Sequence, residues 1–316
     1  MNKPILEKFA EAYHRRESLR AHTNAIRLVN GAGDGLDGLV LEQYDQHCVA
    51  QVFTRDWFGN RDLLCGFVCE YCDAKYFVVK DRTAPVSTKS KDILHDIWIG
   101  SDESKTFVQE YGVTFEVDLN DTINTGLFLD MRANRQLVAN KATGAKVLNG
   151  FAYTCSFGVH CKKQGALSVT NVDISCKVLD RGARNYQLNG VDTTRQEFVR
   201  CDVMDYLTVA VKKRNCFDLI ILDPPSFARS GKKSFSVKKD MASLLDLSFR
   251  VLNPVGQLFI STNFSGMAHR DLEEMITVAA KRRKVVSQQS VGQDIDFVGS
   301  GEREDSCLVG ILVEIE

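Results

Sequence analysis

"EFVRCDVMDYLTVAVKKRNCFDLIILDPPSF" (residues 197–227) contains a strand, a helix and a second strand, and each strand runs into an aspartate. Apolar residues dominate 197–203 and 217–223, whereas 203–214 has the three-to-four-residue spacing of an amphipathic helix. Two strands joined by a helix are expected to run parallel in one sheet.

The same alternation continues through the second half of the chain. Further strands are predicted at 145–151, 167–175, 256–263 and 306–315, and further helices at 157–166, 177–190, 237–252 and 269–283. Strict alternation predicts the α/β class, with a parallel, Rossmann-like sheet covered by helices on both faces. Ligands of such sheets bind at the carboxyl ends of the strands.

The first part of the chain has a different pattern. A helix is predicted for 1–21, antiparallel strands for 25–53, a helix for 61–72 and a strand for 75–81. The length of 316 residues allows about two domains. We therefore predict a smaller N-terminal α+β domain at 1–115 and an α/β domain at 116–316.

The composition is that of an ordinary globular protein, with 44% hydrophobic and 26% charged residues. No apolar run is long enough to cross a membrane, and the charged start does not resemble a secretion signal. We expect a cytoplasmic protein with no membrane partner, and the sequence is compatible with a homodimer.

Ten cysteines are scattered along the chain, which favours reduced thiols over a disulfide framework. Cys65, Cys69 and Cys72 share one face of a predicted helix. Because a metal site would need a fourth ligand, we expect these thiols to belong to the core and predict no metal site.

The net charge is −1, but basic clusters occur at 211–214, 229–239 and 281–284. A single cluster is usually a solvated face. Three clusters in one half of the chain also fit a local RNA-binding patch.

Acidic residues stand at three successive strand ends: Asp173, Asp202 and Asp223, the last followed by Pro224 and Pro225. One such aspartate is usually a helix cap or turn former, but three favour a nucleoside cofactor. Asp173 could accept from ribose hydroxyls, as in dinucleotide folds, and Asp202 from an adenine amino group. No G-x-G-x-x-G motif follows the strand predicted at 145–151, which argues against NAD as the cofactor. S-adenosylmethionine has no phosphate and tolerates a looser turn.

Three segments resemble a known family: "NTGLFLDMRANR" (124–135), "VLNGFAYTCSFG" (147–158) and "LDPPSF" (222–227). They resemble the class I S-adenosylmethionine-dependent methyltransferases of large-subunit ribosomal RNA, over roughly residues 22–316. This group includes the methyltransferases I, which form 5-methylcytosine, and K, which form 7-methylguanosine. The resemblance implies a Rossmann-like class I methyltransferase domain, S-adenosylmethionine as cofactor, rRNA as partner and an RNA-binding role for the N-terminal domain.

The resemblance also implies site residues. The segment 124–135 is expected to form a hairpin and a helix start over the cofactor. The implied cofactor-binding residues are Arg132, Phe151, Tyr153, Asp173, Ile174, Asp202, Val203 and Asp223. In two places the chain departs from the family: "TGG" is replaced by Thr154, Cys155 and Ser156, and a lysine by Asn124.

The chemistry of the methylated atom can be predicted as well. Carbon five of cytosine needs a cysteine thiolate that adds to the ring, and the two positions that carry it in such enzymes hold Ser226 and Phe264. A ring nitrogen such as N7 of guanine needs orientation only. We therefore predict 7-methylguanosine formation without a covalent intermediate.

For this reaction, we expect Asp223, Pro224, Pro225 and Asn263 to form the catalytic floor. Phe227 and Phe264 would stack on an extruded base, unless they are core residues, and Lys232 and Lys233 would hold RNA phosphates. The alternatives are a 5-methylcytosine enzyme, a methyltransferase for a small molecule or protein, and a non-catalytic RNA-binding protein on this fold.

Overall fold

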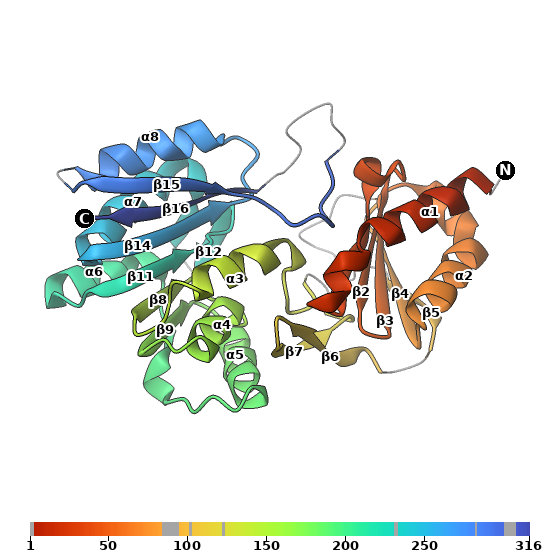
Figure 1. Cartoon of the computed structure of the whole chain (residues 1–316), viewed down its shortest axis with the longest axis horizontal. Helices are drawn as coiled ribbons and strands as arrows, with labels where there is room; N and C mark the ends of the chain where they lie inside the picture. The colour runs from red at the N-terminus through yellow and green to blue at the C-terminus, as the bar shows by residue number, and fades with distance from the viewer. Residues whose placement is uncertain are drawn as a thin grey trace. The chain divides into compact units, whose positions relative to one another are not determined.

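The computed structural model describes residues 3–83, 95–100, 103–121, 124–230, 233–281, 283–299 and 308–316. It divides into two compact units, which are coloured along the chain in Figure 1. Unit 1 contains Met1–Arg132 and Gln293–Ser306, and unit 2 contains Ala133–Gly292 and Cys307–Glu316. The division thus lies at Arg132 rather than at the predicted residue 115, and a late segment of the chain returns to unit 1.

Unit 1 has a five-stranded sheet with the order β1-β2-β3-β4-β5 and a separate hairpin, β6–β7. Its strands are β1 (Ala25–Asn30), β2 (Leu39–Tyr44), β3 (His47–Val52), β4 (Tyr76–Asp81), β5 (His95–Ile99), β6 (Lys105–Glu110) and β7 (Val113–Asp118). Its helices are α1 (Lys3–Arg15) and α2 (Arg61–Cys72), with 3-10 turns at Glu17–Ala21, Gly31–Asp34, Arg55–Asn60 and Leu129–Met131. The antiparallel pairing of β1, β2 and β3 confirms the pattern predicted for residues 25–53.

Alternation along these strands gives the sheet one apolar and one polar face. Leu39 and Leu41 of β2 and Phe77 and Val79 of β4 are buried in a core that includes side chains of α1 and α2. The residues one position away point to the opposite face. That face carries Arg27, Glu42, Tyr44, Gln51 and Lys80.

Unit 2 has a seven-stranded sheet with the order β10-β9-β8-β11-β14-β16-β15. Its strands are β8 (Lys146–Gly150), β9 (Ser168–Asp173), β10 (Phe198–Arg200), β11 (Phe217–Leu222), β14 (Leu252–Thr262), β15 (Val285–Val291) and β16 (Val309–Ile315), and β12 (Phe227–Ser230) and β13 (Lys233–Ser236) form a separate hairpin. Its helices are α3 (Arg132–Ala139), α4 (Ser156–Lys163), α5 (Cys176–Leu188), α6 (Val203–Lys213), α7 (Val237–Val251) and α8 (His269–Ala280), with a 3-10 turn at Arg195–Glu197.

The first five strands of this order are parallel, as predicted, whereas β16 runs antiparallel to both β14 and β15. Helices cover both faces. Leu258 and Ile260 pack in the core that includes α6, α7 and α8, while the ring of Phe259 lies 5.4 Å from that of Phe157 in α4. The predicted α/β, Rossmann-like fold of unit 2 is therefore confirmed.

The cysteine face of α2 lies in unit 1. Cys72 is buried against Cys48 of β3, Cys65 is half-buried and Cys69 is exposed. Among the described residues, no three potential ligands lie together as a metal site. None of the helices in the described part of the chain has the length and apolarity that a membrane span requires.

Candidate active site

The predicted site residues of unit 2 lie at the carboxyl ends of adjacent strands. β8, β9 and β11 end at Gly150, Asp173 and Leu222, and β14 ends just before Asn263. Because these strands are parallel neighbours, their ends form one edge of the sheet, next to the switch in strand order at β8.

The turn from β8 to α4 has an unusual backbone. Phe151, Tyr153 and Cys155 have φ angles of 56°, 48° and 61°, in the left-handed region that favours glycine. A residue with a side chain costs roughly 1–2 kcal/mol there. Hydrogen bonds from the Ala152 N–H to the Val172 carbonyl (3.1 Å) and from the Cys155 N–H to the Ala152 carbonyl (2.7 Å) hold this shape.

The replacement of glycine by Cys155 is accommodated from α5. A Cβ atom built on Gly182 would lie only 2.3 Å from Sγ of Cys155, so the absence of a side chain at Gly182 makes room for this thiol. Cys155 is fully buried, and its burial and the nearby Asp173 raise the pKa of the thiol well above its usual range. The turn therefore keeps a left-handed residue at this position, and the thiol stays protonated.

Asp173 ties the end of β9 to this turn. Its carboxylate accepts hydrogen bonds from the N–H groups of Tyr153 and Ser175, both at 2.9 Å. The carboxylate is half-buried, and the adjacent Ile174 is 42% exposed. An oriented acceptor beside an exposed apolar side chain suits a ribose with an adjoining flat ring.

Asp202 is the N-cap of α6. One of its carboxylate oxygens accepts from the N–H groups of Met204 (2.9 Å) and Asp205 (3.2 Å). Asp202 therefore has the usual role of an aspartate at a strand end, which is to cap a helix. Its other carboxylate oxygen is not used by these bonds. Val203 is buried in the core of unit 2, so only its backbone is available to a ligand.

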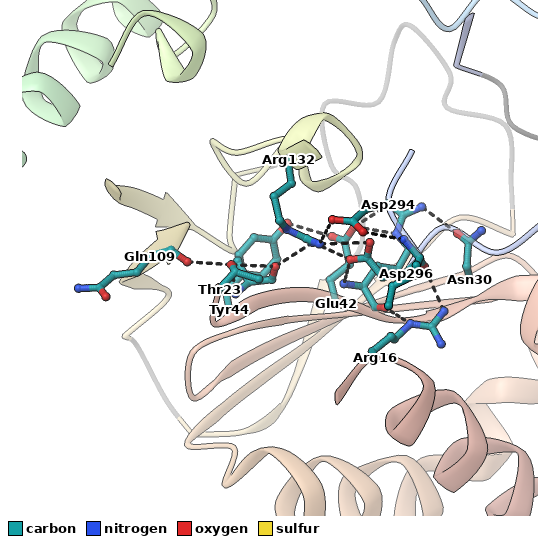
Figure 2. Close-up of polar contacts among 12 residues, drawn as sticks. Arg16, Thr23, Asn30, Glu42, Tyr44, Gln109, Arg132, Asp294 and Asp296 are labelled. Atoms are coloured by element: carbon teal, nitrogen blue, oxygen red, sulfur yellow. Dashed lines mark hydrogen bonds and ion pairs between the residues drawn. The ribbon is translucent and has the colours of Figure 1, made fainter. Parts of the chain in front are cut away.

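Arg132 belongs to unit 1. Its guanidinium donates to Asp296 at 2.6 Å, to Asp294 at 3.1 Å and to the carbonyl of Ala25 at 3.1 Å. Figure 2 shows Arg132 directed toward Asp294 and Asp296. Its side chain is fully buried. The sequence did not predict these partners, which hold the guanidinium within unit 1.

The segment 124–135 also differs from the expectation. It contains the predicted helix start at Arg132 but no hairpin, because Leu127, Leu129 and Met131 are buried at alternating positions instead of pairing with a second strand. The hairpin of this region, β6–β7, comes earlier in the chain.

A second group of predicted residues follows β11 and β14. The hydroxyl of Ser261 donates to Asp223 at 2.8 Å, and the hydroxyl of Ser226 donates to Oδ1 of Asn263 at 2.8 Å. Pro224 is buried, while Pro225 is exposed. This arrangement fixes the amide of Asn263. Neither serine was predictable as a partner: Ser226 of Asn263, or Ser261 of Asp223.

The two predicted stacking residues differ in exposure. Phe227, at the start of β12, is 59% exposed, whereas Phe264 is half-buried against the core. Of the predicted phosphate-binding lysines, Lys232 lies outside the described residues, and Lys233 is described by its backbone in β13 only. Lys238 and Lys239, in the first turn of α7, are exposed.

This edge of the sheet fits S-adenosylmethionine in its donor and acceptor set. Asp173 and Asp202 offer carboxylate oxygens to hydroxyl and amino groups, and Ile174 offers an apolar surface. Gly150 is buried, and its close packing against Leu222 and Val203 leaves no space for a Cβ atom, so the end of β8 requires glycine.

Comparison with known proteins identifies the family. Residues 72–291 match the family model described as S-adenosylmethionine-dependent methyltransferase. The chain belongs to this family. The methyltransferase is accordingly an enzyme, and its cofactor is S-adenosylmethionine.

Individual relatives agree with this result. The methyltransferase is 32% identical to ribosomal RNA large subunit methyltransferase I of Aeromonas hydrophila, over 98% of this chain and 80% of the relative. It is 40% identical to ribosomal RNA large subunit methyltransferase K of Neisseria meningitidis serogroup B, over 59% of this chain and 52% of the relative. A protein solved in complex with SAH, the demethylated cofactor, is similar with a TM-score of 0.86 and 26% identity, over 98% of this chain and 80% of that chain.

Proposed function

We propose that this methyltransferase modifies a base of large-subunit ribosomal RNA and that the methylated atom is N7 of a guanine. The relatives named as large-subunit rRNA methyltransferases support the RNA substrate. The hydrogen bond between Ser226 and Asn263 carries the choice of base.

The side-chain amide of Asn263 has its NH₂ group left to bind a base. Its Oδ1 already accepts the Ser226 hydroxyl, so the exposed amide presents its NH₂ group as a donor. The O6 atom of guanine, which lies beside N7, is an acceptor, whereas adenine and cytosine carry donor amino groups, N6 and N4, at the corresponding edge. Asn263 is therefore better suited to guanine.

The transfer itself requires little acid–base chemistry. S-adenosylmethionine supplies a methyl group on a positively charged sulfur. N7 of guanine carries a lone pair and no hydrogen, so it can form the new bond while the sulfur keeps the electron pair of the old one, and no proton must be removed. The residues around Asp223 and Asn263 would then act by holding the base in line, which can supply much of the rate.

RNA binding would involve the hairpin and helix that follow the Asp-Pro-Pro segment. Exposed Phe227 could stack on a base, at roughly 1–3 kcal/mol. Lys238 and Lys239, together with Lys232 and Lys233, would contact phosphates.

Formation of 5-methylcytosine is the second candidate, because the resembled family includes such enzymes. It is disfavoured because Ser226 and Phe264 replace the nucleophilic cysteines, and because Cys155 is buried with a raised pKa of its thiol.

The test is nucleoside mass spectrometry of large-subunit rRNA from a strain that lacks the gene. We expect 7-methylguanosine to be lost at one position and restored by the wild-type gene but not by Asp223→Ala. Loss of 5-methylcytosine instead would overturn the choice of base, and unchanged rRNA would overturn the RNA substrate.

A further inference from the structure

Unit 1 contains a cavity of about 220 Å³. Its floor is the polar face of the five-stranded sheet, formed by β1, β2, β3 and β4, and the segment 124–130 forms one wall. Phe128 is 40% exposed at this wall, so the cavity reaches the surface. All of these residues belong to unit 1.

The floor of the cavity contains a buried cation with an incomplete set of partners. Lys80 is 2% exposed, and its ammonium group donates one hydrogen bond, to the carbonyl of Asp121 at 2.7 Å. An ammonium group has three donors. No carboxylate of the described residues forms an ion pair with it, although a buried charge normally has one. Two donors of Lys80 are therefore left for another acceptor.

The second cation of the cavity is already neutralised. Arg27 donates to Glu42 with Nε at 3.1 Å and Nη2 at 2.7 Å, and Tyr44 donates to the other oxygen of Glu42 at 3.1 Å. Figure 2 shows Glu42 and Tyr44 within this network. Glu42 is thus occupied, and Asp130, the other carboxylate of the lining, also acts on Arg27. Glu42, Asp121 and Asp118 lie near enough to favour the charge of Lys80, but none of the described carboxylates forms an ion pair with it.

Two amide groups add further donors. Gln51 is the direct neighbour of Lys80 across β3 and β4, and its Oε1 accepts from Arg82 at 3.3 Å, so its NH₂ group is turned away from that contact. Asn124, on the wall, has no hydrogen-bond partner among the described residues and is half-buried. Val49 and Leu127 add apolar surface.

We propose that this cavity of unit 1 is a phosphate-binding site in which Lys80 provides the charge and Gln51 and Asn124 provide amide donors. A phosphate group would supply both the missing counter-ion and several acceptor oxygens. RNA and free nucleotides both carry this group. The inference concerns binding by unit 1 alone and does not rest on the choice of methylated base.

The first experiment measures the thermal midpoint of the full chain with and without inorganic phosphate at low ionic strength, using sodium chloride of equal ionic strength as reference. A ligand that binds the folded state raises the midpoint by mass action. We expect phosphate to raise it in the wild type and in Lys75→Gln, a control that removes an exposed lysine of unit 1, but not in Lys80→Met.

The thermal midpoint of the free Lys80→Met protein also shows whether Lys80 binds a ligand or stabilises the fold. A lysine that holds the fold together would lower the midpoint of the free protein when it is replaced. A buried cation without a counter-ion should do the opposite, because its replacement by an apolar side chain of similar length removes a desolvation cost. We expect the free Lys80→Met protein to be at least as stable as the wild type.

The source of the phosphate is tested with a short single-stranded RNA oligonucleotide, by fluorescence anisotropy. If the ligand is RNA, Lys80→Met binds it roughly tenfold more weakly or worse, and inorganic phosphate competes with it in the wild type. If phosphate stabilises through Lys80 but RNA affinity is unchanged, the site binds free phosphate or a nucleotide. Equal phosphate shifts in the wild type and Lys80→Met, or none in either, would overturn the proposal, while rRNA methylation remains a separate measurement.

Discussion

At the scale of the residue, Asp173 connects the cofactor edge to the backbone that surrounds it. Its carboxylate accepts from Tyr153 and Ser175 and so fixes a turn with left-handed residues. A ligand hydroxyl would bind a carboxylate that is already oriented.

We predict that Asp173→Ala weakens S-adenosylmethionine binding by about tenfold or more, which is about 1.4 kcal/mol. The variant loses both the acceptor and a support of the turn. Isothermal titration calorimetry measures the change, and Asp180→Ala, which removes an exposed carboxylate from α5, is the matched control. Equal affinities of Asp173→Ala and the wild type would mean that the cofactor binds elsewhere.

Cys155 lies in the same turn, and the nucleophilicity of its thiol can be tested. Its thiol is buried with a raised pKa, so it is a poor nucleophile. We predict that Cys155→Ser keeps methyl-transfer activity within about tenfold, a barrier change of about 1.4 kcal/mol or less. The wild type should also form no covalent adduct with RNA that contains 5-fluorocytosine. A gel-stable adduct that disappears in Cys155→Ser would identify the thiol as a nucleophile.

The positions of single site residues were predictable where those residues stand at the end of a strand. Asp173 and Asp223 are at the edge that the alternation of strands and helices implied, and Asp202 is there as a helix cap. Gly182 was not predictable, because its function is to leave space for a side chain from another element. The burial of Arg132 depends on Asp296, which is 164 residues away in the sequence.

At the scale of the element, the first turn of α7 and the end of α6 offer a matched comparison. Both carry two exposed lysines, Lys238 and Lys239 in α7 and Lys212 and Lys213 in α6. Only the α7 pair follows the hairpin that contains Phe227.

We predict that replacing Lys238 and Lys239 with glutamine weakens single-stranded RNA binding and lowers the slope of log K against log salt by about 0.7 per lost phosphate contact. The Lys212/Lys213 double variant, which loses the same charge, should leave the slope unchanged. Anisotropy titrations at several salt concentrations measure both. Identical slopes for the two variants would make the α7 pair an ordinary solvated surface.

The second prediction at this scale concerns the pKa of Lys80 in β4. Burial, followed by repulsion from Arg82, lowers the pKa of Lys80 from 10.5 to about 8. Between about pH 8 and 10.5 the unfolded chain therefore binds more protons than the folded chain, so this lysine makes folding more favourable as pH rises through that window.

We predict that the stability of the wild type relative to Lys80→Met rises from pH 8 to pH 10 and is constant below about pH 7. Urea unfolding followed by tryptophan fluorescence measures this, because both tryptophans, Trp57 and Trp98, belong to unit 1. Lys75→Met is the exposed control and should run parallel to the wild type. A constant difference between wild type and Lys80→Met would show that Lys80 keeps its ordinary pKa.

Elements were predictable where their periodicity is strong. Apart from the hairpin β12–β13, the strands and helices from β8 to α8 follow the predicted order, because most of them bury a clear apolar face. β15 was missed because its sequence, "VVSQQSV", buries only Val291 and pairs along one edge. The hairpin β12–β13 was missed because most of its residues have polar or short side chains.

At the scale of the whole molecule, the chain passes between its two units three times, after Arg132, after Gly292 and after Ser306. A boundary drawn from the sequence assumes one crossing, and for this reason the late segment of unit 1 was assigned to the second domain. Asp296 shows the reason for its return: its carboxylate binds Arg132 and the N–H group of Arg27, and its carbonyl accepts from Arg16.

The ion pair between Arg132 and Asp296 should therefore hold this segment in unit 1. Both side chains are fully buried, and the removal of one partner leaves a charge without compensation. We predict that Arg132→Met or Asp296→Asn destabilises unit 1 by about 3–5 kcal/mol, and that the double variant costs less than the sum of the two. Glu17→Gln, which removes a carboxylate that is 73% exposed beside His14, should cost at most about 0.5 kcal/mol. Urea unfolding followed by tryptophan fluorescence reports all four variants, and additive effects of the two single substitutions would contradict a coupled pair. If the coupling is found, the segment around Asp296 unfolds together with β1 and α1, and the cooperative unit of this protein is set by a buried charge and not by sequence order.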